Sequence, residues 1–169
     1  FYYVQLSSID RPSWPWFRDS QRRLMDAIPH TGMAVSSDYG DSLDVHPKNK
    51  RPIGERLAHW ALNRTYDKKQ VVPSGPLFRS VDFREDAAYV SFDYADGLHT
   101  ADGRPIREFE IAETEGVYYP AKAEVVGNQV KVYSDRVKHP CHVRYAWRPF
   151  TRANLVNSQS LPASTFRSR

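Results

Sequence analysis

The spacing of apolar residues predicts strands and helices in the first part of the chain. Helices are expected over residues 17–28, which Pro29 ends, and from about 48 to 64, and short apolar runs predict strands at 1–6 and 31–37. The order strand, helix, strand, helix is typical of part of a parallel α/β sheet. Residues 1–6 are expected to form a buried strand that begins in mid-fold, so we expect the natural N-terminus to lie upstream.

After residue 70 the pattern changes to short strand-like runs bounded by turn residues, and no helical spacing is evident. Gly127-Asn128, between two alternating runs, indicates a hairpin. The predicted strands cover residues 77–83, 87–92, 109–112, 122–126, 129–133 and 141–147. We therefore expect an α/β unit over residues 1–70, a linker-like stretch at 71–76, and an antiparallel β-sandwich domain over residues 71–169.

The composition is that of a folded protein, with 40% hydrophobic residues and a formal net charge of +4. Basic and acidic residues are interleaved, so nucleic acid is not an expected partner. No apolar stretch approaches the length of a membrane span. The single cysteine, Cys141, excludes an internal disulfide bond.

The loop between the second strand and the second helix holds the main candidate for catalysis, His46. A strand end in an α/β sheet is where active-site pockets form. There, an imidazole held by a carboxylate can take the proton from a hydroxyl nucleophile. Asp44 is the first candidate for that carboxylate, because residues two apart on an extended backbone project the same way. Asp41 and Asp38 are alternatives, although both residues also favour turns.

No nucleophile motif accompanies this histidine. The chain has no Gly-x-Ser-x-Gly elbow. Ser7-Ser8 and Ser36-Ser37 follow the two predicted strands, but no glycine flanks them. Any serine chemistry would therefore need a residue that this chain does not contain. We expect no cofactor and no metal site, since no His, Cys and acidic residues occur at ligand spacing.

Three aromatic residues are candidates for stacking on a sugar ring, namely Trp14, Trp16 and Tyr39. All three lie in predicted loops. Packing under a loop is the other role open to them.

The chain resembles the C-terminal part of sialate O-acetylesterases, which are serine esterases of the SGNH superfamily, named for its Ser-Gly-Asn-His blocks. The resemblance extends in order over nearly the whole chain. The segments that carry it are Phe1–Leu6, Asp38–Lys50, Ile53–Leu57, Ser74–Leu77, Phe109–Ala112, Pro120–Lys122, Val143–Trp147, Asn154-Leu155, Leu161–Ser164 and Phe166-Arg167.

The resemblance implies the C-terminal portion of a three-layer α/β SGNH hydrolase domain followed by a β-sandwich. It implies hydrolysis of acetyl esters on sialic acid, at the 9-O position, with His46 as the catalytic histidine. The nucleophilic serine would lie upstream, so this chain alone would be inactive and its partner would be the N-terminal portion of the same esterase. The superfamily usually places the acid three residues before the histidine, where this chain has Leu43. The group that orients His46 therefore stays open: it is Asp44, another acid, or none, in a Ser-His dyad.

Two other functions remain as alternatives. One is an acetylesterase acting on plant polysaccharide. The other is a carbohydrate-binding or interaction module without catalysis. For the esterase, the resemblance implies a secreted or periplasmic location.

Overall fold

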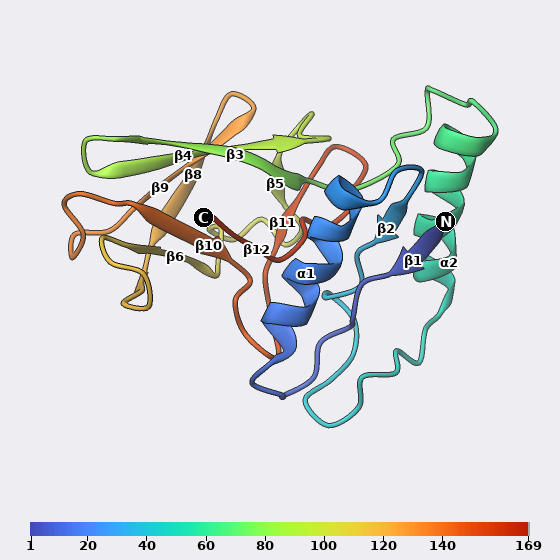
Figure 1. Cartoon of the computed structure of the whole chain (residues 1–169), viewed down its shortest axis with the longest axis horizontal. Coiled ribbons are helices and arrows are strands. Elements are labelled where there is room, and N and C mark those ends of the chain that lie inside the picture. Colours follow the sequence, from blue (N-terminus) through green and yellow to red (C-terminus); the bar gives the residue numbers. More distant parts are fainter. Residues whose placement is uncertain (169) are drawn as a thin grey trace.

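Strand β1 (Tyr2–Val4) pairs in parallel with β2 (Gly32–Ala34), and α1 (Trp14–Ala27) connects them (Figure 1). The computed structural model describes residues 1–168. The Tyr3 hydroxyl donates to the carbonyl of Gln21 on α1, at 2.5 Å, whereas the Tyr2 hydroxyl lies 2.6 Å from Thr65 Oγ1, beyond α2. Neighbouring strand residues point to opposite faces. Helices α1 and α2 therefore cover opposite faces of this parallel pair, as the α/β pattern predicts.

Both predicted helices form, with shifted ends. Helix α1 begins at Trp14, earlier than predicted, because Pro15 fits its first turn. Helix α2 (Arg51–Trp60) also carries proline in its first turn and passes into a π-helical turn, η1 (Ala61–Thr65). On α2, Trp60 packs on β2 so closely that a Cβ at Gly32 would lie 2.5 Å from its ring.

The prediction that residues 1–6 form a buried strand is wrong. Phe1 is 82% exposed and Val4 is 37% exposed, while the polar Gln5 is fully buried. Strand β1 has one neighbour, β2, within residues 1–168, so its other edge lies open. The Gln5 amide donates to the Arg18 carbonyl (3.0 Å) and to Ser164 Oγ (2.8 Å). In this segment the polar Gln5 is buried because it has hydrogen-bond partners, whereas the apolar Phe1 and Val4 stay exposed.

Antiparallel sheets make up the rest of the fold. Two of them have four strands each, in the orders β3-β4-β9-β8 and β12-β10-β6-β7, and a third pairs β11 with β5. The inward side chains of the first two sheets share one apolar core. The strands are β3 (Leu77–Arg84), β4 (Ala87–Asp93), β5 (His99–Thr100), β6 (Phe109–Ala112), β7 (Tyr119–Pro120), β8 (Lys122–Val126), β9 (Gln129–Tyr133), β10 (His142–Tyr145), β11 (Leu155–Val156) and β12 (Phe166–Arg167).

The six longer strands agree with the predicted positions, and the hairpin at Gly127-Asn128 joins β8 to β9 as predicted. Strands β5, β7, β11 and β12 were not predicted, because two residues are too short to show an alternating pattern. Short as it is, β12 places Phe166 at the centre of the core, where its ring lies 4.4 Å from that of Phe78.

The linker-like stretch is an ordered, packed segment. Residues Pro73–Pro76 are buried, and a Cβ on Gly75 would lie 2.1 Å from the carbonyl oxygen of Pro162. The chain after β10 runs back to the α/β unit, so residues near both ends of the sequence meet.

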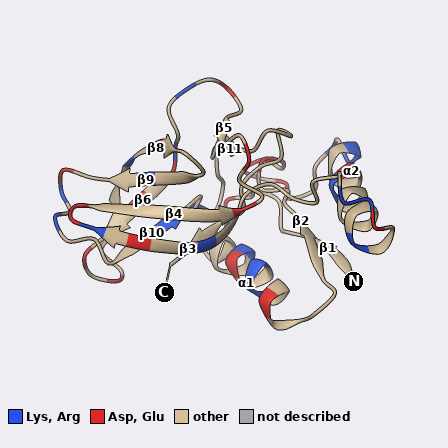
Figure 2. Cartoon of the chain, turned by 90° about the horizontal axis from the view of Figure 1, so that it is seen from above, with Lys and Arg blue, Asp and Glu red and all other residues tan. Residues whose placement is uncertain are grey.

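Acidic and basic residues are mixed over α1 and β3, as Figure 2 shows. Among residues 1–168, no helix has the length and apolar character needed to cross a membrane.

Candidate functional site

The loop between β2 and α2, residues 35–50, carries His46 and the three candidate carboxylates. Its start is fixed against the segment that leaves β1. The Ser8 N–H donates to the Tyr39 carbonyl at 2.9 Å, and Ser8 forms a parallel bridge with Gly40. A Cβ on Gly40, whose φ is +93°, would lie 2.2 Å from the Ser8 carbonyl oxygen, so this close approach requires glycine. The loop therefore leaves the carboxyl end of β2 along a defined path.

Asp44 and His46 are in direct contact. Asp44 Oδ1 accepts hydrogen bonds from the His46 backbone N–H and from ring Nδ1, each at 2.9 Å. These bonds, the backbone one first, lower the pKa of the Asp44 carboxyl. The His46 side chain is 80% exposed, and within residues 1–168 its Nε2 has no hydrogen-bond partner. One ring nitrogen is thus held by a carboxylate while the other faces outward.

The other two carboxylates point elsewhere. Asp41 Oδ1 accepts the backbone N–H groups of Leu43 and Asp44, both at 2.8 Å, and so shapes the turn before His46. Asp38 faces α2, where its two oxygens bind Arg56 at 2.7 and 2.6 Å. The structure therefore brings Asp44 to His46 and keeps Asp38 and Asp41 out of contact with the ring.

Arg56 is a residue of this region that sequence reasoning missed. Its guanidinium binds Asp38 with both ends, donates to the Val35 carbonyl at 2.7 Å, and lies over the Tyr39 ring at 5.4 Å. It therefore fixes the first turn of the loop to α2. Arg56 follows the buried Ile53 by three residues, and this spacing places both side chains on one side of the helix. The sequence could therefore have indicated that Arg56 faces the rest of the fold.

The serines near the two strand ends are buried and bonded to one another or to the backbone. Ser7 Oγ lies 2.9 Å from Ser36 Oγ, which donates to the Gln5 carbonyl. Ser8 Oγ donates to the Ser37 carbonyl at 2.5 Å. In the part of the chain that the structure describes, no serine or threonine hydroxyl is hydrogen-bonded to His46.

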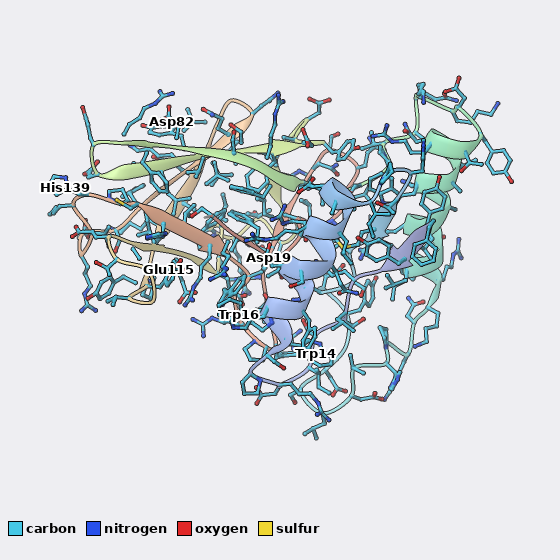
Figure 3. The ribbon with its side chains drawn as sticks, in the orientation of Figure 1. Trp14, Trp16, Asp19, Asp82, Glu115 and His139 are labelled. Atoms are coloured by element: carbon cyan, nitrogen blue, oxygen red, sulfur yellow. The ribbon has the colours of Figure 1, made fainter. Side chains whose placement is uncertain are left out.

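The aromatic candidates do not form one surface. Trp14 and Trp16 diverge from the start of α1 (Figure 3): the Trp14 indole donates to the Ser7 carbonyl at 2.8 Å, whereas Trp16 packs edge-on against Trp147 at 5.2 Å. Trp16 is 50% exposed. Of the three, Tyr39 alone lies on the His46 loop. Their sugar-binding role stays a prediction.

Residues 1–168 contain no group of three or more His, Cys, Asp or Glu side chains placed to hold a metal ion.

Comparison with known proteins gives one informative similarity. No protein-family model matches the chain, and no curated protein matches it. Among solved structures, the crystal structure of a carbohydrate acetylesterase from Xanthomonas citri matches with a TM-score of 0.92 and 36% sequence identity. The match covers 100% of this chain and 40% of the acetylesterase chain, so the chain spans less than half of that protein.

The fold of this chain is thus similar to part of a carbohydrate acetylesterase. At this identity and TM-score, the β-rich architecture and its preceding α/β unit are shared over the whole chain. The relationship supports the carbohydrate-esterase part of the sequence prediction.

Proposed function

We propose that this chain supplies the catalytic histidine and its orienting acid to a carbohydrate acetylesterase whose nucleophilic serine lies outside residues 1–169. The observation that carries the proposal is the Asp44–His46 pair, with Nδ1 held at 2.9 Å and the ring exposed on a strand-exit loop. The similarity to a carbohydrate acetylesterase supports the reaction class.

Exposed apolar side chains support the docking of a further part of the protein beside β1. On α1 and at the residue that follows it, three of them recur at helical spacing, and Val4 lies on the open strand. Gln21 lies within this stripe, and its side chain accepts from the Leu6 N–H (2.9 Å) and donates to the Val4 carbonyl (3.2 Å), so a docking strand would replace these two bonds. An open edge beside an apolar face is a pairing site for another strand. The three stripe residues are Phe17, Leu24 and Ile28.

Leu43 supports the same docking on the His46 loop. Its side chain is 90% exposed, next to the residues that hold His46. In this proposal the serine-bearing part covers Leu43, the loop and the open edge. We propose that this arrangement is an SGNH-type domain, to which residues 1–70 contribute the last part of the sheet.

In the proposed reaction, the serine Oγ attacks the acetyl carbonyl carbon while His46 Nε2 takes the hydroxyl proton. The imidazolium is stabilised by the Asp44 carboxylate at Nδ1. His46 then gives its proton to the sugar oxygen as the ester C–O bond breaks, leaving an acetyl-serine. A water molecule, deprotonated by the same nitrogen, attacks this ester, and acetate leaves as the serine regains its proton.

The acetyl ester on the 9-O position of sialic acid is the proposed substrate, and acetylated plant polysaccharide is the second candidate. Both are acetyl esters of carbohydrates, and the similar solved structure is that of a carbohydrate acetylesterase.

The test uses the full-length protein that contains this chain, with His46→Ala compared with His139→Ala. Acetate release is measured from 9-O-acetylated sialic acid, acetylated xylan and 4-nitrophenyl acetate. Loss of a general base lowers the rate by about 10²- to 10⁴-fold, so His46→Ala is expected to lose this activity on every substrate cleaved. His139 lies on the sandwich (Figure 3), and its replacement is expected to have no effect.

The same protein is labelled with a fluorophosphonate, which reacts with activated serines, and the modified residue is located by mass spectrometry. The proposal expects a serine outside residues 1–169. A label on a serine of this chain, or full activity of His46→Ala, would contradict it.

A further inference from the structure

A polar groove crosses the end of the sheet β3-β4-β9-β8. It has a volume of about 570 Å³ and is lined by residues of β3, of β4 and the segment after it, and of the turn into β9. A second groove, of about 640 Å³, lies between α1 and β3. Arg79 and Asp93 line both grooves, so the two lie next to each other. Pockets for drug-sized ligands usually measure about 300–1,000 Å³, and the polar groove by itself lies within this range.

The lining of this groove is mainly polar. Phe92 and Ala95 lie beneath it, but they are 7% and 8% exposed and belong to the apolar core. The rim offers hydrogen-bond donors and acceptors together: Gln129 Nε2 already donates to Ser91 Oγ at 2.8 Å, and Arg79 lies beside Asp93 at 3.9 Å. The rim residues are Arg79, Ser80, Ser91, Asp93, Asp96, Asn128 and Gln129.

The wall after β4 is fixed in place by the chain that leaves β11. Asn157 Nδ2 donates to the Tyr94 carbonyl at 3.1 Å, and the Ser158 N–H donates to the Asp96 carbonyl at 2.8 Å. At Gly97, whose φ is +66°, a Cβ would lie 2.8 Å from Ser158 Cβ. A wall held in this way loses little conformational entropy when a ligand binds.

The charges of the rim indicate the chemical class of ligand that the groove can bind. Arg79 is its one basic residue among those that the structure describes, and two carboxylates, Asp93 and Asp96, accompany it. A polyanion such as nucleic acid would meet this net negative charge unfavourably. Neutral hydroxyl groups, each both a donor and an acceptor, match a rim of Arg, Asp, Asn, Gln and Ser side chains.

We infer that this groove binds a neutral oligosaccharide as a site separate from the His46 loop. In Figure 1 the loop after β2 runs to the bottom of the view, whereas β3 and β4 lie at the top. The groove therefore contacts the backbone of a polymeric carbohydrate at a distance from any acetyl group being cleaved. The inference does not depend on the proposed esterase function, because binding needs neither His46 nor a serine.

The test is an NMR titration of the full ¹⁵N-labelled chain with xylohexaose, cellohexaose and mannohexaose, which carry no acetyl groups. At least one is expected to shift the amide signals of Ser80, Ser91–Asp96 and Gln129. Arg79→Ala and Asp96→Ala are each expected to weaken that binding roughly tenfold, through the loss of a hydrogen bond to a charged group.

Arg84→Ala is the matched control, since Arg84 lies on the same strand and also pairs with an aspartate, Asp82, at 2.7 Å, but outside the groove. It is expected to leave the affinity unchanged. Arg79 is 70% and Arg84 60% exposed, so neither replacement disturbs the core. Absence of groove shifts with all three sugars, or equal weakening by Arg79→Ala and Arg84→Ala, would overturn the inference.

Discussion

Asp44 fixes both the backbone and the ring of His46 through a single carboxylate oxygen. This bond selects the ring tautomer in which Nδ1 carries the proton, so Nε2 is the nitrogen left to act as a base. Both side chains are exposed, and water therefore competes for each bond until another surface covers the loop.

Asp44→Asn is expected to lower the acetate-release rate of the full-length protein about 10- to 100-fold, because an amide cannot stabilise the imidazolium. Loss of a residue that orients a general base commonly costs this much or more. The measurement is kcat against pH. Asp41→Asn is the control, because an amide oxygen still accepts the two backbone N–H groups. Equal losses in the two variants would show that only the loop conformation matters.

Arg18 joins distant parts of the chain from a fully buried position. It donates to the carbonyls of Pro149 (3.0 Å), Ala146 (3.1 Å) and Arg148, and through Nε to Thr165 Oγ1 (3.0 Å). Burial lowers the pKa of this guanidinium to about 10. Even so, the charge remains at neutral pH, and four of its five N–H donors are bonded to Thr165 and to the three carbonyls.

Arg18→Met is expected to destabilise the fold by about 3 kcal/mol, because buried carbonyls lose their donor. The measurement is urea unfolding of the chain. Arg23→Met is the control, since Asp19 keeps its bond to Arg22 at 3.0 Å and the Arg23 side chain is 21% exposed. Arg23→Met is expected to lower the free energy of unfolding by about 1 kcal/mol. A loss below 1 kcal/mol for Arg18→Met would show that the contacts of Arg18 do not hold the two parts together.

At the scale of elements, the loop that carries His46 is anchored at both sides, by Ser8 after β1 and by Arg56 of α2. A loop that bears a catalytic side chain works best when a rigid scaffold sets its position. The planar guanidinium of Arg56 binds the Asp38 carboxylate and the Val35 carbonyl at once.

Arg56→Lys keeps the charge but loses the two-ended contact with Asp38. The amides of residues 38–46 are expected to exchange with deuterium several-fold faster, and kcat of the full-length protein is expected to fall while the fold is retained. Arg51→Lys is the control on the same helix, where the exposed side chain is bonded to Glu55, at 2.7 Å. Unchanged exchange in Arg56→Lys would argue against this anchor.

Over the whole molecule, the segment between the α/β unit and the sheets is clamped by the C-terminal tail. Asn157 Nδ2 donates to the Ser74 carbonyl at 3.0 Å, and the Ser164 N–H donates to the Pro76 carbonyl at 3.1 Å. Gly75 lies between these two contacts, directly against Pro162.

Gly75→Ala is expected to destabilise the protein by about 1–3 kcal/mol, because its Cβ would press on backbone that cannot move aside. Gly54→Ala, in α2 with nothing within 4 Å of its Cβ, is expected to stabilise by about 0.5–1 kcal/mol. Thermal unfolding measures both. A neutral Gly75→Ala would mean that the tail separates easily from this segment.

Much of the fold and one contact of the site could be read from the sequence, because they depend on neighbours along the chain. Helical spacing located α1 and α2, alternation located the longer strands, and the two-residue spacing of Asp44 and His46 made their contact feasible. The roles of Asp38 and Arg56 could not be predicted, because a bidentate pair across 18 residues depends on how the helix docks.

The sequence by itself thus determined the local elements, the absence of a nucleophile motif, and the position of the candidate histidine at a strand exit. Only the tertiary structure decided that β1 is an open edge, that the tail clamps residues 73–76, and that Arg18 and Gln5 are buried. The physical reason is that periodicity reports which face of an element is apolar. Which surfaces meet, and which polar groups are buried and satisfied between them, depends on contacts between residues far apart in the chain.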